Sequence, residues 1–285
     1  MPHSDFKPFS LLSASPAAAT AGSAGTGTEP WTPLPYPDVP RYDARSLRTH
    51  WPRLHAGHAL PPPAPDAPLA EGWALYHSGE FERAAALGLL HGPDGLALAN
   101  QATAIYANYL EPREAVRLAL FRQVIERAGA QVAIEPDNCQ ALYWQAYALG
   151  RYSQGISVAR ALAQGLGTKL KGALEHVIEL QPEHGDAHLA LAAFHAEVID
   201  KVGALVGRMT YGVRADTSIE LFERGLALHP HSAAGMMEYA RALLMLHGES
   251  RTGEANRLFE KAAALTPADA RERLDVELAR AGLTE

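Results

Sequence analysis

Two stretches of this sequence contain arginine and lysine but no aspartate or glutamate. The first runs from Asn138 to Leu174, and the second lies between Asp200 and Asp216. Such stretches are unexpected in a chain with 32 carboxylates and a net charge of -7. Arginine and lysine bind carboxylate and phosphate groups, and arginine can do so through two parallel hydrogen bonds. If the two stretches are neighbours in space, they predict a pocket for an anionic small molecule or for an acidic peptide segment.

The side chains that we assign to this ligand-binding pocket are cationic, phenolic or amide groups of the two stretches. They are Arg151, Tyr152, Gln154, Lys169, Arg208, Tyr211 and Arg214. If the pocket forms, Arg151, Arg208 and Arg214 should approach one another. The alternative is that these basic groups lie over apolar helix surfaces or pair with carboxylates elsewhere in the chain.

Histidines suggest a second kind of chemistry, which is metal binding. His184 and His188 are four residues apart, so on a helix they share a face and could bind zinc. His176, Glu183 and Asp186 are close to them in sequence. However, His184 falls at or before the expected start of its helix, and His188 occupies a position that packs against a neighbouring helix. We therefore expect buried, hydrogen-bonded histidines, and we assign no metal and no cofactor.

Catalytic signatures are missing from the sequence, which contains no Gly-x-Ser-x-Gly, phosphate-loop or His-Glu-x-x-His motif. Cys139 is the only cysteine, and no paired base is identifiable for it. We therefore predict that the chain is not an enzyme.

A group of aromatic residues is the candidate lining of a partner groove. Tyr143 and Tyr147 share a helix face, while Trp144 lies about 100° away. Together with Tyr106 they could line a concave surface of the kind that helical arrays use to bind peptides. Packing between helices is the alternative.

The elements that must position these side chains are marked by four prolines. Pro136, Pro182, Pro230 and Pro267 each follow an apolar helical run, and proline cannot continue a helix. The intervals between them are 46, 48 and 37 residues, compared with about 34 for a tetratricopeptide repeat (TPR). The surplus predicts insertions at about 150–167 and 200–215. Both fall between the first and second helix of their units, so they should emerge on the same edge of a stacked array.

Residues 69–281 resemble a divergent TPR array. The last unit has small, aromatic, small and proline residues at the positions that the family prefers. These are Ala255, Phe259, Ala262 and Pro267. The resemblance implies an all-α fold, a right-handed solenoid of helical hairpins over residues 67–283. The terminal helix at about 269–283 would cap this solenoid.

A narrower resemblance covers roughly residues 128–267. The sequence segments that carry it are Tyr143-Trp144, Leu149-Gly150-Arg151, Gln154-Gly155, Ile178-Glu179-Leu180-x-Pro182 and Ala187-His188. They are similar to the T component associated with TRAP-type transporters and to the regulator of microtubule dynamics family. The resemblance implies a helical repeat domain without established catalytic residues.

The first 66 residues have a different character, because 14 of the 20 prolines lie at or before Pro68. This predicts a Pro-rich, largely irregular arm. Residues 13–28 are rich in alanine, serine, glycine and threonine and are expected to be disordered. The aromatic residues from Trp31 to Trp51 are expected to lie along the array, or else to form a sticky linker.

Composition limits the classes of partner. The acidic balance argues against nucleic-acid binding, and no apolar run reaches the roughly 18 residues that span a bilayer. We therefore predict a cytoplasmic, noncatalytic binding or adaptor protein that uses a helical-repeat surface to bind a protein or peptide partner. The first alternative is an accessory protein that binds a small anion, and the second is an enzyme with an unrecognised site.

Overall fold

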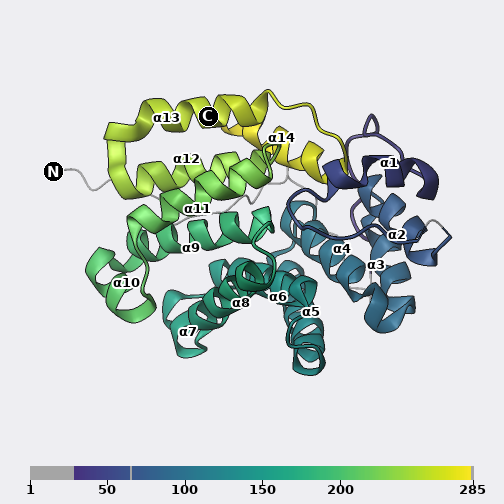
Figure 1. Ribbon diagram of the computed structural model, residues 1–285, viewed down its shortest axis with the longest axis horizontal. Helices are drawn as coiled ribbons and strands as arrows, with labels where there is room; N and C mark the ends of the chain where they lie inside the picture. The colour runs from purple at the N-terminus through teal and green to yellow at the C-terminus, as the bar shows by residue number, and fades with distance from the viewer. Residues whose placement is uncertain (1–28, 65, 284–285) are drawn as a thin grey trace.

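The computed structural model describes residues 29–64 and 66–283, and every regular element in these ranges is a helix. Figure 1 shows their arrangement. The α-helices are α1 (Ala44–Leu54), α2 (Pro68–His77), α3 (Phe81–Leu90), α4 (Leu96–Tyr109), α5 (Glu114–Ile134), α6 (Cys139–Gln154), α7 (Val158–Ala163), α8 (Leu166–Leu180), α9 (Gly185–Val202), α10 (Ala204–Tyr211), α11 (Ala215–Leu228), α12 (Ala233–His247), α13 (Thr252–Ala263) and α14 (Ala270–Gly282). Two 3-10 helices, η1 (Gly92–Gly95) and η2 (Gly248–Arg251), precede α4 and α13.

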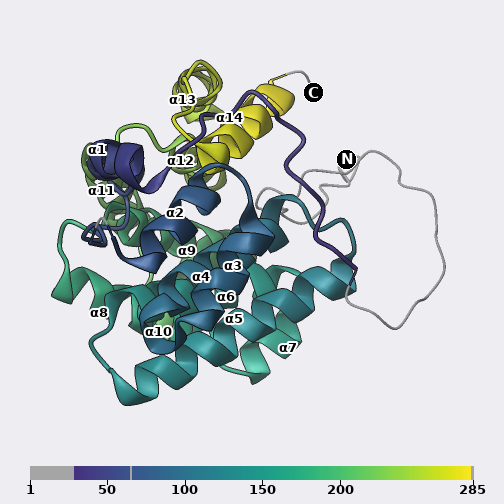
Figure 2. The same ribbon diagram turned by 90° about the vertical axis from the view of Figure 1, so that its right-hand side faces the viewer.

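The helices form successive antiparallel hairpins, which confirms the predicted all-α array. The pairs are α2 with α3, α4 with α5, α6 with α8, α9 with α11 and α12 with α13, and α14 follows as a single helix. First helices stack on one another: α2 on α4, α4 on α6, α9 on α12 and α12 on α14. The last helix, α14, also contacts α2, so the array curves back on its own beginning (Figures 1 and 2).

The prolines mark helix boundaries as predicted. Pro136, Pro182 and Pro230 each lie in a short loop, and the next helix begins three residues after the proline. The side chain just before each of those helices accepts a hydrogen bond from a first-turn N–H group. These capping residues are Asn138, His184 and Ser232.

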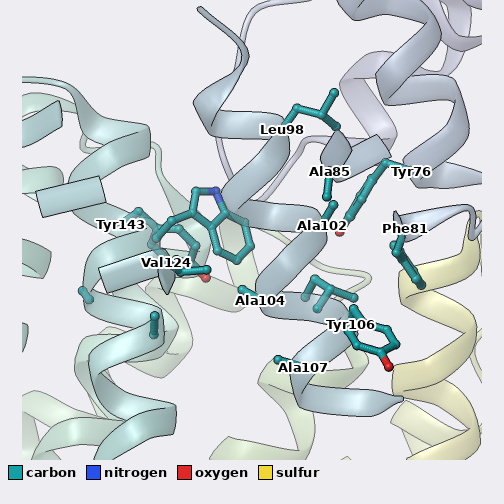
Figure 3. Close-up of a cluster of buried hydrophobic side chains, with 14 of the residues drawn as sticks. Tyr76, Phe81, Ala85, Leu98, Ala102, Ala104, Tyr106, Ala107, Val124 and Tyr143 are labelled. Carbon is teal, nitrogen blue, oxygen red and sulfur yellow. The ribbon is translucent and has the colours of Figure 1, made fainter. Parts of the chain in front are cut away.

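The core of the first hairpins combines large aromatic side chains with alanines. Tyr76 and Tyr106 are fully buried, and Ala102 and Ala107 lie between helices that approach closely (Figure 3). The crossing of α3 and α4 requires glycine, because a Cβ atom on Gly88 would lie 2.7 Å from the carbonyl oxygen of Gly95. Small residues at these positions let whole helices touch, and the aromatic rings fill the remaining space.

The predicted arm is more ordered than the sequence indicates, because residues 29–64 are folded onto the array. Trp31 stacks on Tyr106 with ring centroids 4.1 Å apart. Helix α1 was not predicted; it begins at a capping box in which the Asp43 carboxylate accepts from the N–H of Ser46. This helix buries Leu47 and Trp51 in the main core. The expectation of disorder for residues 13–28 lies outside the described residues.

The arm also contacts the last helix of the array and the loop before it. Tyr42 donates a hydrogen bond of 2.6 Å to the carbonyl of Ala268, and Arg53 forms a two-pronged ion pair with Glu272 on α14. Asp38 lies 2.8 Å from Arg273 on the same helix. The arm therefore holds α14 in place beside α2.

None of the helices in the described part of the chain is long and apolar enough to cross a membrane.

Candidate functional site

A cavity of about 220 Å³ opens between α6 and α9. These two helices are neighbouring first helices of the array, yet they make few direct contacts, whereas α4 packs against α6 and α9 against α12. Side chains of α8 and α12, and residues of both predicted insertions, complete the cavity wall. The cavity therefore lies where the regular stacking is interrupted.

Apolar and charged side chains both line the cavity, and we call these two sets its apolar wall and its charged wall. The apolar wall consists of side chains from α7 to α10. They include Leu162, Leu166, Leu170, Phe194, Val198 and Tyr211. The charged wall comes from α6, α9, α12 and α14. It consists of Arg151, Asp186, Glu197, Lys201, Glu238 and Arg271. The three cations balance the three carboxylates, so the lining as a whole carries no net charge.

The carboxylates of Glu197 and Glu238 lie on this charged wall with cations close by. The oxygen of Glu197 is 3.4 Å from the amine of Lys201, and that of Glu238 is 3.6 Å from the guanidinium of Arg241. Burial raises the pKa of both glutamates in spite of these cations. The guanidinium of Arg151 lies over the ring of Tyr147, 5.2 Å from its centroid. The site therefore presents charge in a partly dehydrated setting, where electrostatic contacts are strengthened.

The cavity brings together three of the seven side chains predicted to bind a ligand. Arg151, Gln154 and Tyr211 line it. Tyr152 is buried, and its ring lies 5.7 Å from the guanidinium carbon of Arg122. Tyr152 therefore packs within the array.

The other three predicted ligand-binding residues are exposed and do not line this cavity. They are Lys169, Arg208 and Arg214. Arg214 pairs with Asp216 at 2.7 Å, as the alternative of local ion pairing expects. This cavity therefore does not bring the guanidinium groups of Arg151, Arg208 and Arg214 together. The two insertions nevertheless touch, since a Cβ atom on Gly167 would lie 3.1 Å from the ring of Tyr211.

Of the four aromatic residues predicted to line a partner groove, two line the cavity and two are buried in the core. Tyr143 and Tyr147 line the cavity. Trp144 is completely buried and stacks on His58 at 5.2 Å. Tyr106 is buried beneath Trp31. Trp144 and Tyr106 therefore belong to the core, because the arm covers the surface that they would otherwise present.

A buried network of charged and polar side chains that the sequence did not reveal reaches the cavity lining through Asp186 and Arg271. Its centre is Asp186 at the start of α9, with 4% of its side chain exposed. One carboxylate oxygen lies 2.7 Å from Nδ1 of His229. The other lies 3.1 Å from the guanidinium of Arg271 and 3.3 Å from Nε2 of His58. The backbone N–H of Asp186 donates to the carbonyl of Gly57. The network therefore fixes the arm to α9 and α14 at once.

A second buried chain of polar groups links α1 to α14. Nε2 of His55 lies 3.0 Å from Nε2 of His77, and Nδ1 of His77 lies 2.6 Å from the carboxylate of Asp269. On α14, the carboxylate of Asp275 accepts a hydrogen bond from the hydroxyl of Tyr109, and burial raises the pKa of Asp275 to about 6. These contacts hold the end of α1, α2 and the start of α14 together.

The histidines considered for metal binding are buried in separate roles. His184 caps α9, with its Nδ1 accepting from the N–H of Ala187 at 3.1 Å. Nδ1 of His188 lies 3.0 Å from the carbonyl of His184. In residues 29–64 and 66–283, no group of three or more His, Cys, Asp or Glu side chains is placed to hold a metal ion.

Comparison with solved structures identifies the architecture. A thermophilic TPR protein of Thermus thermophilus has a similar structure, with a TM-score of 0.52, covering 75% of this chain and 97% of that chain at 18% sequence identity. The fold is TPR-like. The human IFIT1 dimer with PPP-AAAA aligns with a TM-score of 0.42, covering 79% of this chain and 56% of that chain at 18% identity. No family model and no curated protein sequence matches this chain.

Acidification is expected to weaken the fold through His184. Burial lowers the pKa of His184 to about 3, from an unfolded value near 6.5. The folded protein therefore favours the neutral ring, so this stabilisation is complete above about pH 6.5 and is lost as the pH falls toward 3. The loss amounts to at most about 1.4 kcal/mol per pH unit. Urea unfolding between pH 7 and pH 4.5 measures it.

The matched variant for this experiment is His184→Asn, because asparagine retains a capping acceptor but does not titrate. Its stability should fall less steeply with decreasing pH than that of the unmodified protein. The buried rings of His55 and His58 also have lowered pKa values because of desolvation, so part of the slope should remain. Asp275 opposes the trend, since its raised pKa favours the protonated form between about pH 4 and 6. If stability fell equally steeply with decreasing pH in both proteins, the attribution of part of this fall to His184 would be contradicted.

Proposed function

We propose that this chain is a noncatalytic binding protein whose cavity between α6 and α9 receives a segment of a partner protein. The observation that carries the proposal is the position of the cavity. It lies among the first helices of a TPR-like array, and both apolar and charged side chains line it. A segment that combines an apolar side chain with a charged or polar group would match both walls.

The role that we propose for each wall follows from its chemistry. Leu166, Leu170 and Phe194 would receive the apolar side chain, and its removal from water would supply most of the binding free energy. Arg151 and Glu238 would orient the polar part of the segment, because a misplaced polar group at a buried charge loses hydrogen bonds. Tyr147 would keep the Arg151 guanidinium in position.

The test is a cavity-filling substitution, Ala193→Trp, since Ala193 lines the cavity and its neighbours on α9 already form the wall. Peptides selected from a displayed random library against the full chain should lose at least about tenfold in affinity for this variant, because an indole would occupy the space that the segment needs. Titration calorimetry measures the dissociation constants.

The matched control is Leu90→Trp, which adds the same ring to a residue that is 84% exposed at the end of α3. It should leave peptide affinity unchanged. Selected peptides that bind the Ala193→Trp protein as tightly as the unmodified protein would contradict the cavity as the binding site.

A small-molecule ligand is the second candidate, and one observation favours it. The two insertions meet over the cavity at Gly167 and Tyr211, which partly encloses the space. In this case carboxylate or phosphate compounds, and not library peptides, should raise the melting temperature, and Ala193→Trp should abolish that rise. The narrower resemblance to the T component and to the regulator of microtubule dynamics family stays a prediction, and so does a cytoplasmic location.

A further inference from the structure

Helix α10 carries an unusual concentration of exposed apolar side chains. Ten large apolar side chains are exposed among the described residues, and three of them lie on this eight-residue helix. Leu205 is 73% exposed, Val206 52% and Met209 80%. Leu205 and Met209 are four residues apart and therefore share a helix face. Exposed apolar groups that cluster in this way mark an interaction surface.

The helix is mounted so that its apolar face points outward. Gly203 and Gly212 bound it with φ angles of 84° and 67°, values that glycine adopts without strain. Its inner face is fixed at Gly207, where a Cβ atom would lie 2.8 Å from the side chain of Val213. The exposed apolar residues of α10 therefore take no part in packing the helix against the array. Figure 1 shows α10 projecting from the edge of the array on which α7 also lies.

Helix α10 itself carries one cation and no carboxylate, whereas Glu197 and Asp200 precede it in the chain and Asp216, which pairs with Arg214, follows it. Residues 203–214 contain Arg208 and Arg214 and no carboxylate. The guanidinium of Arg208 is exposed on α10 itself. On the same edge, α7 adds exposed Arg160 and a half-exposed Leu162. The exposed guanidinium groups of Arg208 and Arg160 would attract an anionic surface.

The shape of this surface indicates which kind of partner would bind it. A partner helix docks its apolar face into a groove, whereas Leu205, Val206 and Met209 are exposed on a short helix. That helix projects from the array (Figure 1). A bilayer interface accepts protruding apolar side chains between its headgroups, and anionic headgroups attract neighbouring arginines. We propose that α10 docks the protein peripherally on anionic membranes. Leu205, Val206 and Met209 enter the headgroup region, and Arg208 contacts lipid phosphate.

The test is co-sedimentation of the full chain with vesicles. Binding to phosphatidylcholine vesicles that contain phosphatidylglycerol should exceed binding to pure phosphatidylcholine, and the excess should shrink at high salt, where the Debye length falls to about 3 Å. The double substitution Leu205→Asp and Met209→Asp should lower the partition coefficient at least about tenfold. Arg208→Gln should lower it about fivefold.

The matched control is Leu90→Asp, since Leu90 is as exposed as Met209 but lies on α3, in a segment that also carries Asp94. It should partition like the unmodified protein. Because all these side chains are exposed, circular dichroism and the melting temperature should stay unchanged in every variant. Equal partitioning of the Leu90→Asp protein and the double variant would overturn the proposal, as would the absence of binding to anionic vesicles at low salt.

A reporter on the helix distinguishes a membrane from a protein partner. The emission of the Met209→Trp protein should shift to the blue with anionic vesicles, while that of the Leu90→Trp protein should show no added shift. A blue shift of the Met209→Trp protein with an acidic amphipathic peptide, and none with vesicles, would make α10 a protein interface and overturn membrane docking.

Discussion

Replacement of Asp186 by alanine is expected to lower the free energy of unfolding by about 3–5 kcal/mol, because it leaves the buried guanidinium of Arg271 and the rings of His229 and His58 without their carboxylate partner. Its two oxygens contact His229 and Arg271 at 2.7 and 3.1 Å. Burial alone would raise the pKa of Asp186, but His229 and Arg271 outweigh it and hold that pKa well below its usual range. The stabilisation is therefore present above the unfolded pKa near 4 and is lost as the pH falls below it.

Denaturant unfolding at pH 7 measures this effect, and Asp216→Ala is the control. Asp216 also pairs with an arginine, at 2.7 Å, but both side chains of that pair are more than half exposed. Its removal should leave stability unchanged within error. An equal effect of the two substitutions would show that the Asp186 network does not hold the arm and α14 to α9.

Replacement of Trp51 by alanine is expected to have a comparable effect, about 3–5 kcal/mol, because it creates a large cavity in the main core. The indole is 2% exposed and stacks on His55 with centroids 3.7 Å apart. Its Nε1 donates a hydrogen bond of 2.7 Å to the carbonyl of Leu60. The loss should appear in the melting temperature and in the denaturant midpoint.

Leu90→Ala is the control for this substitution, since Leu90 is 84% exposed at the end of α3. It should change stability by less than about 0.5 kcal/mol. If Trp51→Ala behaved like Leu90→Ala, the segment from 29 to 64 would be an attached linker and not part of the folded unit.

The helices and the cavity differ in how far the sequence predicts them. Pro136, Pro182 and Pro230 end helices for a local reason, the geometry of the proline ring, so the sequence predicts those boundaries well. The surplus length of the repeats likewise predicts the segments that become α7 and α10. Of the candidate ligand-binding residues, Arg151, Gln154 and Tyr211 line the cavity, while Arg208 and Arg214 do not. Absence of acidic residues from a stretch does not indicate which way its cations point.

The amino-acid sequence by itself determined an array of helical hairpins, because periodicity, proline and capping side chains act within a few residues of one another. Only the tertiary structure decided that the array closes on itself and that the arm completes its core. The contacts responsible join residues far apart in the chain: Arg271 meets Asp186 across 85 residues, and Tyr42 meets Ala268 across 226. A local sequence pattern does not indicate such pairs, because each partner, taken alone, resembles an ordinary surface residue.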